Sequence, residues 1–395
     1  MSKNQAGDEE SQRDGTADEI NLLRPEPVPP PSRPEYVHKK SDMPAVSATL
    51  LSGTFVLVKD VYPTGLAVLA ELKKQVFGSV KSTGKKHQSD KFRGSEEAKI
   101  PESVDPNDFL SYRRKRTVFR HASNKLLVPV KENRIALRKS PDIGWLSELY
   151  PDISDFMLTF PQIQGLNSSW QWFLKGVRFP VLKREIFPWY GTYFPTRFDH
   201  LHLFNDWLKS YQGHKTDAFD IGTGCGVLSF QLIENGFRQV LATDINPNAI
   251  VTVRENARHH GFEDRLEARL SDLFERCDRM ADLIVFNPPW LPAESEGDTA
   301  HLDKAIYYDP DLFRRFFTDA GGFLKENGRL VVFFSNLGRT SGLEAIHPVE
   351  QELAQNRRFK KIRLLRRKVA APSRKTTRRD HRKKEHVELW ELVRV

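Results

Sequence analysis

The stretch Asp220-Ile221-Gly222-Thr223-Gly224-Cys225-Gly226 decides the fold of this 395-residue chain. A short apolar run ends at Ile221, and a helical pattern begins at Gly226, so the glycines stand between a predicted strand and a predicted helix. Glycines at alternate positions let the backbone turn sharply and approach a ligand without a Cβ in the way. The stretch therefore predicts a ligand-binding turn.

Strand-like and helical patterns alternate around this turn. The strand candidates are 218–221, 240–244, 283–286 and 330–335, and the helix candidates are 226–235, 247–259 and 312–324. Such alternation is typical of β-α-β units that build a parallel sheet covered on both faces. Two further strand candidates, 361–366 and 386–395, are joined by a basic loop and predict an antiparallel hairpin at the sheet edge. The predicted fold class is α/β, with ligands at the carboxyl ends of the strands.

Acidic residues around the turn favour a cationic ligand. A dinucleotide site would read Gly-x-Gly-x-x-Gly, whereas this turn reads Gly-x-Gly-x-Gly, and Asp220 before it would repel a diphosphate but attract an ammonium group. Asp244 ends the next strand, where it is placed to accept both hydroxyls of a ribose, and Asp272 would end the third strand and meet an adenine amino group. Each acid alone is also common as a helix or turn cap. Together they predict an adenosine ligand with a free amino-acid end.

A second motif, Asn287-Pro288-Pro289-Trp290, would end the fourth strand at the same edge of the sheet. The Asn287 side-chain oxygen and the Pro288 carbonyl can accept both N–H bonds of a planar, conjugated nitrogen and support charge as that nitrogen becomes tetrahedral. Pro289 stiffens the turn, and Trp290 can stack on a flat acceptor. Taken alone, the motif is as readily an ordinary turn after a strand.

These motifs resemble those of the class I S-adenosylmethionine-dependent methyltransferases. The resemblance implies a Rossmann-like, doubly wound seven-stranded sheet, S-adenosylmethionine as cofactor, no metal, and a catalytic turn from Asn287 to Trp290. The cofactor site that it implies consists of Asp220, Gly222, Thr223, Gly224, Gly226, Asp244, Ile245, Asp272 and Asn287. In this family, Asn-Pro-Pro followed by an aromatic residue marks methylation of an adenine amine, a guanine amine or a glutamine amide.

From about Phe187 onward the chain resembles the glutamine methyltransferases of release factors and ribosomal proteins. The resemblance lies in the stretches Gly191–Asp199, Asp244–Ala249 and Arg254–Ala257, and Asn-Pro-Pro-Trp-Leu-Pro is similar to the Asn-Pro-Pro-Tyr-Ile-Pro of that group. Three features depart from it. Trp290 replaces the usual Tyr, the region before the resemblance is longer and contains strand candidates, and the basic stretch near the C-terminus is heavier.

The composition divides the chain into three parts. Residues 1–44 are rich in proline and are expected to form a disordered leader. Residues 45–186 are expected to form a separate α+β region that recognises a substrate or partner, with a hairpin at 126–137. Residues 187–395 are expected to form the methyltransferase domain, with the basic loop 367–385 between its last two strands.

Charge and cysteine content narrow the class of protein. The net charge is +9, yet residues 357–384 contain fifteen Lys or Arg and one acid, so the rest of the chain is net negative. This segment and a basic cluster at Arg113–Arg120 indicate contact with a polyanion. The alternatives are a solvated disordered loop for the segment and a solvated strand or helix face for the cluster. No apolar run is long enough to span a membrane, and two cysteines provide no disulfide framework, so we expect a cytoplasmic protein.

The sequence therefore predicts an enzyme, an S-adenosylmethionine-dependent N-methyltransferase, and leaves its acceptor open. Our first interpretation is an exocyclic amine of adenine or guanine in nucleic acid, RNA ahead of DNA, with the basic segments as the docking surface. The alternative is the side-chain amide of a glutamine in a release factor or ribosomal protein. A small-molecule methyltransferase and a catalytically silent binding module come after these.

Overall fold

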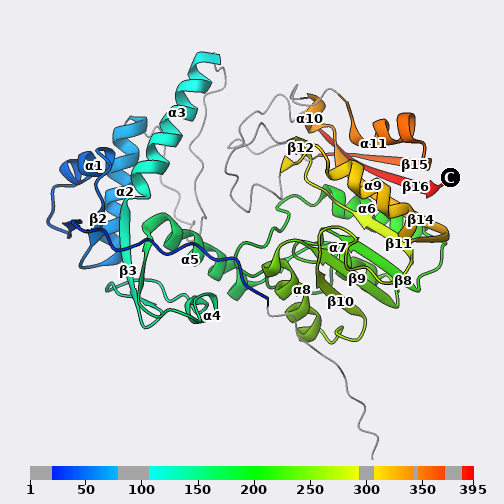
Figure 1. Cartoon of the computed structure of the whole chain (residues 1–395), viewed down its shortest axis with the longest axis horizontal. Helices are drawn as coiled ribbons and strands as arrows, with labels where there is room; N and C mark the ends of the chain where they lie inside the picture. The colour runs from blue at the N-terminus through cyan, green and yellow to red at the C-terminus, as the bar shows by residue number, and fades with distance from the viewer. Residues whose placement is uncertain (1–19, 79–105, 293–306, 341–345, 370–384) are drawn as a thin grey trace, which may run out of the picture.

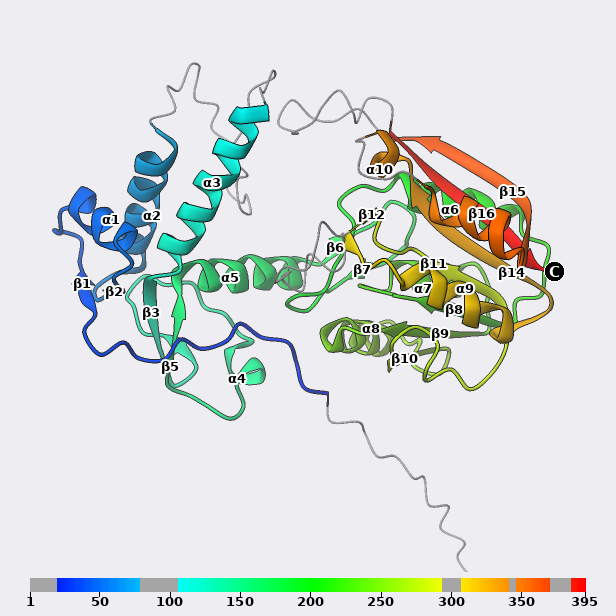
Figure 2. The same ribbon diagram turned by 45° about the horizontal axis from the view of Figure 1, so that its top comes forward.

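The computed structural model describes residues 20–78, 106–292, 307–340, 346–369 and 385–395. Within these residues the chain builds one sheet from its N-terminal part and a larger one from its C-terminal part. The long helix α5 (Phe160–Lys175) runs from the first sheet toward the second (Figures 1 and 2).

The larger sheet has seven strands in the described residues, in the order β10-β9-β8-β11-β14-β16-β15. Neighbouring strands are parallel except that β16 runs antiparallel to both β14 and β15. The strands are β8 (Asp217–Ile221), β9 (Gln239–Asp244), β10 (Leu266–Leu270), β11 (Ala281–Phe286), β14 (Leu324–Ser335), β15 (Phe359–Lys368) and β16 (His386–Arg394). The predicted α/β class, the doubly wound sheet and the antiparallel hairpin at its edge are confirmed.

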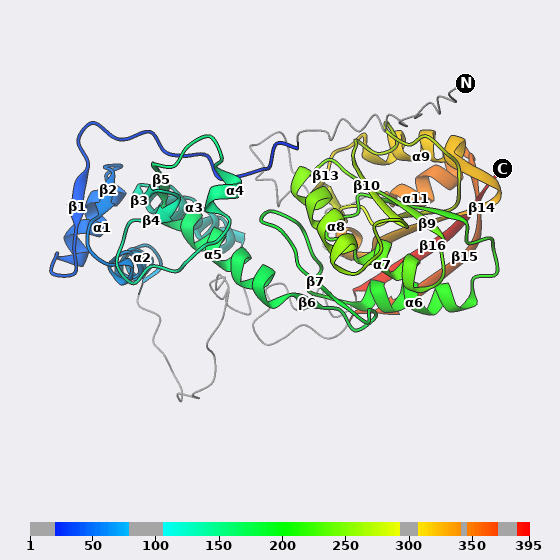
Figure 3. The ribbon, with the colours of Figure 1, turned by 90° about the horizontal axis from the view of Figure 1, so that it is seen from below.

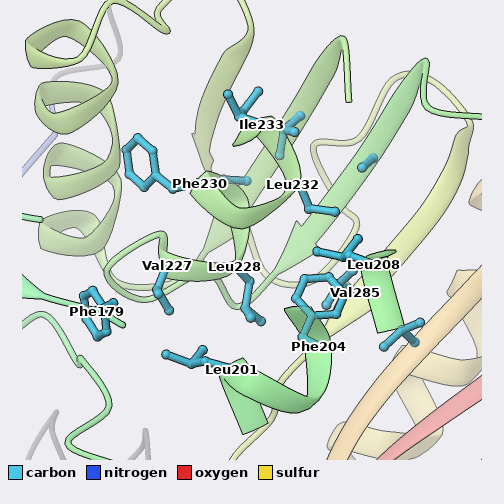
Figure 4. Close-up of a cluster of buried hydrophobic side chains, with 14 of the residues drawn as sticks. Phe179, Leu201, Phe204, Leu208, Val227, Leu228, Phe230, Leu232, Ile233 and Val285 are labelled. Carbon is cyan, nitrogen blue, oxygen red and sulfur yellow. The ribbon is translucent and has the colours of Figure 1, made fainter. Parts of the chain in front are cut away.

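Helices cover both faces of this sheet because side chains alternate along each strand. In β8, Ala218 points into one apolar core and Phe219 into the other. The helices over the first core are α6 (Asp199–Ser210), α7 (Val227–Glu234) and α8 (Pro247–His259), and those over the second are α9 (Leu312–Phe323) and α11 (Pro348–Gln351). Figure 3 shows α6 and α7 on the opposite side of the sheet from α9 and α11, and Figure 4 shows part of the first core. α8 has the predicted bounds, because Asn246 caps it and Pro247 occupies its first position.

Short elements complete the C-terminal part. β12 (Leu291–Pro292) pairs in parallel with β13 (Tyr307–Tyr308), and β6 (Val177–Arg178) pairs antiparallel with β7 (Glu185–Ile186). α10 (Leu337–Thr340) precedes α11, and a π-helical turn, Glu352–Asn356, follows it. Among the described residues, no helix combines the length and the apolar character needed to cross a membrane.

The N-terminal part is an α+β region with a core of its own, as predicted. Its strands are β1 (Glu35–Val37), β2 (Val56–Val58), β3 (Leu126–Lys131), β4 (Arg134–Ile135) and β5 (Phe156–Thr159), and its other helices are α1 (Met43–Leu51), α2 (Tyr62–Phe77), α3 (Pro106–Ser123) and α4 (Leu146–Leu149). β1, β2 and β3 are parallel, whereas β4 and β5 both run antiparallel to β3. The predicted hairpin is β3–β4, which turns through Glu132 and Asn133 at φ values of 50° and 55°.

The expectation of a disordered leader is wrong for residues 20–44. This segment forms β1 and the start of α1, and residues before β1 bind to the rest of the chain. Tyr150 donates its hydroxyl to the Pro25 carbonyl at 2.6 Å, and the Val28 N–H donates to the Met157 carbonyl at 2.8 Å. Proline removes backbone donors but leaves the carbonyls as acceptors, and tertiary contacts satisfy them here. Residues 1–19 of the predicted leader lie outside the described residues.

The predicted basic loop is shorter at its start than the sequence indicates. Arg367 and Lys368 continue β15, where they pair with Val387 and His386 of β16. Residues 370–384 lie outside the described residues.

Candidate functional site

The turn between β8 and α7 requires glycine at three positions. Gly222, Gly224 and Gly226 have φ values of 67°, 53° and 83°, which side chains with a Cβ rarely adopt. A Cβ on Gly226 would lie 2.9 Å from Val253 Cγ2 of α8, and one on Gly224 would lie 3.1 Å from the Tyr193 carbonyl oxygen. The backbone of the turn thus lies close to a second stretch of backbone, at the edge where ligands of such sheets bind.

The Asp220 carboxylate is buried beneath this turn, and among the described residues only one of its two oxygens has hydrogen-bond partners. Oδ2 accepts hydrogen bonds from Thr223 Oγ1 at 2.7 Å, from Ser229 N at 3.0 Å and from Ser229 Oγ at 2.6 Å. Oδ1 has no partner among the described residues. Burial raises the pKa of Asp220 to about 6, against the opposing effect of these hydrogen bonds. A cation at Oδ1 would stabilise the ionised form, so the site fits the predicted ammonium group.

Asp244 ends β9 and is fixed by two backbone donors. Its Oδ2 accepts the Gly224 N–H at 2.8 Å, and its Oδ1 accepts the Asn246 N–H at 2.9 Å. Burial raises the pKa of Asp244, and both hydrogen bonds oppose the rise. The next residue, Ile245, has 57% of its surface exposed. A carboxylate beside an exposed apolar side chain presents acceptors for hydroxyl groups next to a surface for a flat ring.

Asp272 lies just beyond β10, along the same edge as Asp220 and Asp244. Its Oδ2 accepts a hydrogen bond from Arg315 Nη1 of α9 at 2.7 Å, an ion pair that the sequence did not predict. The predicted contact of Asp272 with an adenine amine stays a prediction. Among the residues described, no group of three or more His, Cys, Asp or Glu is placed to hold a metal ion.

The Asn287–Trp290 turn follows β11, next to β8 in the sheet. The Asn287 Oδ1 atom is buried and has no partner in the described part of the chain. Pro288 is buried, and Pro289 is half-buried. Trp290 packs at the margin of both apolar cores, with its ring edge-on to His200 at a centroid distance of 5.6 Å. The turn therefore presents a buried acceptor oxygen beside a half-buried indole.

The sequence did not predict the residues that hold the predicted site residues in place. Ser229 and Arg315 fix the carboxylates of Asp220 and Asp272. The Tyr193 carbonyl accepts the Cys225 N–H at 3.1 Å and so closes one side of the glycine turn. Tyr193 lies in the stretch 191–199 that carries part of the family resemblance, which was its only signal in the sequence.

Four of the eight basic residues in the described part of the C-terminal basic segment form ion pairs. Arg358 pairs with Glu352, Arg363 with Glu391, Arg366 with Glu388 and Arg367 with Asp206, at 2.6, 2.8, 2.9 and 3.4 Å. These partners come from α6, β16 and the π-helical turn, so β15 is held to its own domain by its arginines. In the second basic cluster, Arg114, Lys115, Arg116 and Arg120 are exposed on α3.

Comparison with known proteins places this geometry in a family. Residues 202–363 match the family described as the methyltransferase small domain. A Methanocaldococcus jannaschii protein provisionally named a protein N5-glutamine methyltransferase is 30% identical over 149 residues, covering 36% of this chain and 75% of the relative. The release factor glutamine methyltransferase of Aquifex aeolicus is 40% identical over 161 residues, covering 38% of this chain and 54% of the relative.

A third relative, the ribosomal protein uL3 glutamine methyltransferase of Neisseria gonorrhoeae, is 31% identical over 154 residues, covering 36% of this chain and 50% of the relative. The chain thus spans about half the length of two of these relatives and three quarters of the first. The glycine turn, the unpaired Asp220 oxygen and the acid at the end of β9 fit the S-adenosylmethionine that the family uses. The chain belongs to the methyltransferase small domain family of class I S-adenosylmethionine-dependent methyltransferases.

Proposed function

We propose that this enzyme methylates the side-chain amide nitrogen of a glutamine in a protein. The observation that carries the proposal is that the buried Asn287 Oδ1 has no hydrogen-bond partner in the described residues. This atom lies in a stiff turn that follows β11, at the edge of the larger sheet that carries Asp220 and Asp244. Two relatives with names that specify glutamine methylation of a release factor and of a ribosomal protein support the same acceptor. This reverses the order of the sequence-based interpretations, in which a nucleic-acid base stood first.

The proposed chemistry assigns a role to each polar group of the site. S-adenosylmethionine, when bound, supplies a methyl group activated by its positive sulfur. Asp220 holds the ammonium group, Asp244 the ribose hydroxyls with Ile245 against the adenine, and Asp272 the adenine amine. An amide nitrogen is a weak nucleophile because its lone pair is delocalised into the carbonyl. Asn287 Oδ1 and the Pro288 carbonyl would accept hydrogen bonds from its two N–H groups, orient it for in-line attack and stabilise the positive charge that develops. The attack would break the bond from the methyl group to the sulfur, and the methylated nitrogen would release one proton to solvent.

A nucleic-acid acceptor has less support. The same two acceptors would suit an adenine amine, but Arg358, Arg363 and Arg366 of the basic hairpin already pair with carboxylates. A surface that binds phosphates needs cations free to replace counterions. We therefore keep nucleic acid as an outcome of the test below.

We further propose that the N-terminal region selects the acceptor. We take β1 to α5 as the recognition unit and β6 to β16 as the catalytic unit, because β6 and β7 pack in the core of the larger sheet; the boundary thus lies before the predicted residue 187. α5 supports this division of labour, because Trp172 near its end contacts Phe194, the neighbour of Tyr193 beside the glycine turn, at a centroid distance of 5.7 Å. An acceptor held by the first unit would reach the second along this helix.

Transfer of labelled methyl groups tests the proposed function. Purified enzyme and labelled S-adenosylmethionine are added to a cell extract, which is then separated into protein, RNA and DNA. We expect label in a protein band, recovered as N5-methylglutamine after proteolysis. Label confined to RNA or DNA contradicts the proposal and restores the base-methylation interpretation.

The variant Asn287→Ala tests the acceptor oxygen. We predict that it lowers kcat/KM by about 100-fold or more, because an oriented group that stabilises developing charge is removed. The dissociation constant of S-adenosylmethionine should stay within about twofold, as measured by calorimetry. Full activity in this variant contradicts the assigned role of Asn287.

A further inference from the structure

Two aromatic rings at the Asn287–Trp290 turn each carry a buried nitrogen that has no hydrogen-bond partner in the described part of the chain. His200 of α6 and Trp290 meet edge to face, with centroids 5.6 Å apart and planes at 89°. Neither His200 Nε2 nor Trp290 Nε1 has a hydrogen-bond partner within the described residues. An indole nitrogen is always a donor, whereas one nitrogen of a neutral imidazole is an acceptor. The two rings in contact therefore carry complementary hydrogen-bonding groups, a donor on Trp290 and a potential acceptor on His200, that are not bonded to each other.

The surroundings of His200 keep its imidazole neutral. The residue is 4% exposed, and its ring also packs against Phe333 of β14. Burial, with a smaller contribution from the nearby His202, lowers the pKa of His200 to about 4. A neutral imidazole with its proton on Nδ1 offers Nε2 as a hydrogen-bond acceptor.

Three other tryptophans of the chain have a hydrogen-bonded indole N–H. Trp189, Trp207 and Trp390 donate their indole N–H to Glu255, Glu391 and Glu388 at 2.6, 2.8 and 2.9 Å. Trp145 also lacks a partner in the described residues, but it lies in the core of the N-terminal part. A buried donor left unpaired costs free energy. At Trp290 the unpaired N–H donor lies in the turn that would bind the amide to be methylated.

We propose that His200 is a positioning residue. When the substrate amide lies against the Trp290 ring, His200 Nε2 accepts a hydrogen bond from the indole N–H, and this bond sets the angle of the ring. The inference rests on the proposed function, because it assigns Trp290 the face against which the glutamine amide lies. His200 itself does not touch the acceptor. A ring fixed by this hydrogen bond holds the amide plane so that its nitrogen stays within reach of Asn287 Oδ1. The Trp that replaces the usual Tyr of related enzymes would thus have a partner of its own in this chain.

A double-mutant cycle tests the coupling between the two rings. The variants are His200→Phe, which keeps a ring edge against Trp290 but removes Nε2, Trp290→Phe, which removes the indole N–H, and the double variant. The readouts are kcat/KM and KM for a glutamine-containing peptide taken from the protein that becomes labelled. We expect His200→Phe to lower kcat/KM about fivefold, as for one lost hydrogen bond, and mainly through KM. In the Trp290→Phe background the same substitution should have no further effect.

Independent effects of the two substitutions overturn the proposal, because they show that the rings act separately. His200→Gln guards against a merely structural effect, since its Oε1 can accept near the position of Nε2. We expect it to recover at least half of the loss in kcat/KM, and no recovery counts against the hydrogen bond. The dissociation constant of S-adenosylmethionine, measured for every variant, reports whether the site is folded.

The same cycle separates this inference from the proposed function. If the wild-type enzyme methylates RNA and no protein, the glutamine proposal fails, and the cycle is then measured with that RNA. Coupling between positions 200 and 290 with the RNA acceptor still supports His200 as the positioning residue. Additive effects with either acceptor refute it.

Discussion

At the scale of single residues, Asp220 shows how the site is built around a charge that the chain does not itself supply. Three hydrogen bonds reach its Oδ2, while Oδ1 is buried without a partner in the described residues. A buried carboxylate without a cation is unfavourable, which is why burial raises its pKa to about 6. The free enzyme therefore contains a group that a bound ammonium ion stabilises in its ionised form.

We predict that the affinity for S-adenosylmethionine falls as the pH drops below about 6. Only the ionised Asp220 attracts the ammonium group, and its fraction falls about tenfold for each pH unit below the pKa. Asp220→Asn should weaken binding by about 100-fold and abolish this pH dependence, as measured by calorimetry between pH 5 and 8. Asp217→Asn is a matched control, because Asp217 begins the same strand and pairs with Lys325 at 2.6 Å. A wild-type affinity that is constant over this range contradicts the role of Asp220.

At the scale of elements, the β15–β16 hairpin is held by a buried carboxylate that gathers positive and polar groups. Glu388 of β16 accepts hydrogen bonds from Arg366, His386 and Trp390, each at 2.9 Å, and its Oε2 lies 3.2 Å from His347 Nε2. Burial alone would raise the pKa of Glu388, but the nearby His347, Arg366 and His386 outweigh it and lower the pKa to about 2. The carboxylate thus favours the folded state whenever it is ionised.

We predict that Glu388→Gln lowers the free energy of unfolding by about 3 kcal/mol at pH 7. The pKa is lower in the folded chain than in the unfolded chain, so this contribution is complete above about pH 4.5 and is lost as the pH falls toward 2. Urea unfolding at pH 7 and at pH 3 measures both effects. Glu350→Gln, which breaks an exposed pair with Arg339, should cost less than about 1 kcal/mol. Equal losses in the two variants would show that burial of Glu388 does not matter.

At the scale of the whole molecule, α8 is the element that joins the N-terminal part to the catalytic sheet. Trp189 lies in the N-terminal core, stacked on Trp145 at 5.5 Å, yet it donates its backbone N–H to Thr252 and its indole N–H to Glu255 of α8. Asn248 at the start of α8 binds both the N–H and the carbonyl of Leu23 at 2.8 Å. Residues 20–28 therefore act as a strap across the two parts.

We predict that Asn248→Ala releases the strap, defined as residues 20–28. The buried amide makes three hydrogen bonds to backbone groups of Leu23 and Tyr190, and their loss should cost about 3 kcal/mol of unfolding free energy. Hydrogen exchange at residues 20–28 should accelerate before global unfolding. The control Asp152→Ala removes the exposed ion pair with Arg24 but keeps the contacts of Arg24 with Leu149 and Tyr150, and it should leave exchange at Leu23 close to that of the wild type. Unchanged exchange in the Asn248 variant contradicts the strap.

Features with a local cause could be predicted from the sequence. The glycines at 222, 224 and 226 predict a turn with positive φ, and Asn246 is the N-cap of α8. The alternating strands gave the fold class, since a strand buried on both faces reads as a short apolar run. The strap could not be predicted in this way, because its prolines indicate disorder when they are read without their tertiary partners.

The sequence by itself thus determined the sheet, the glycine turn and the order of the acids along the cofactor edge, because backbone preference and apolar periodicity act between near neighbours. Only the tertiary structure decided what each side chain meets. Arg315 reaches Asp272 from 43 residues away, and Leu23 reaches Asn248 from 225 residues away. The unpaired oxygens of Asp220 and Asn287 are likewise products of packing, since a missing partner is a property of the whole surrounding volume and not of any stretch of sequence.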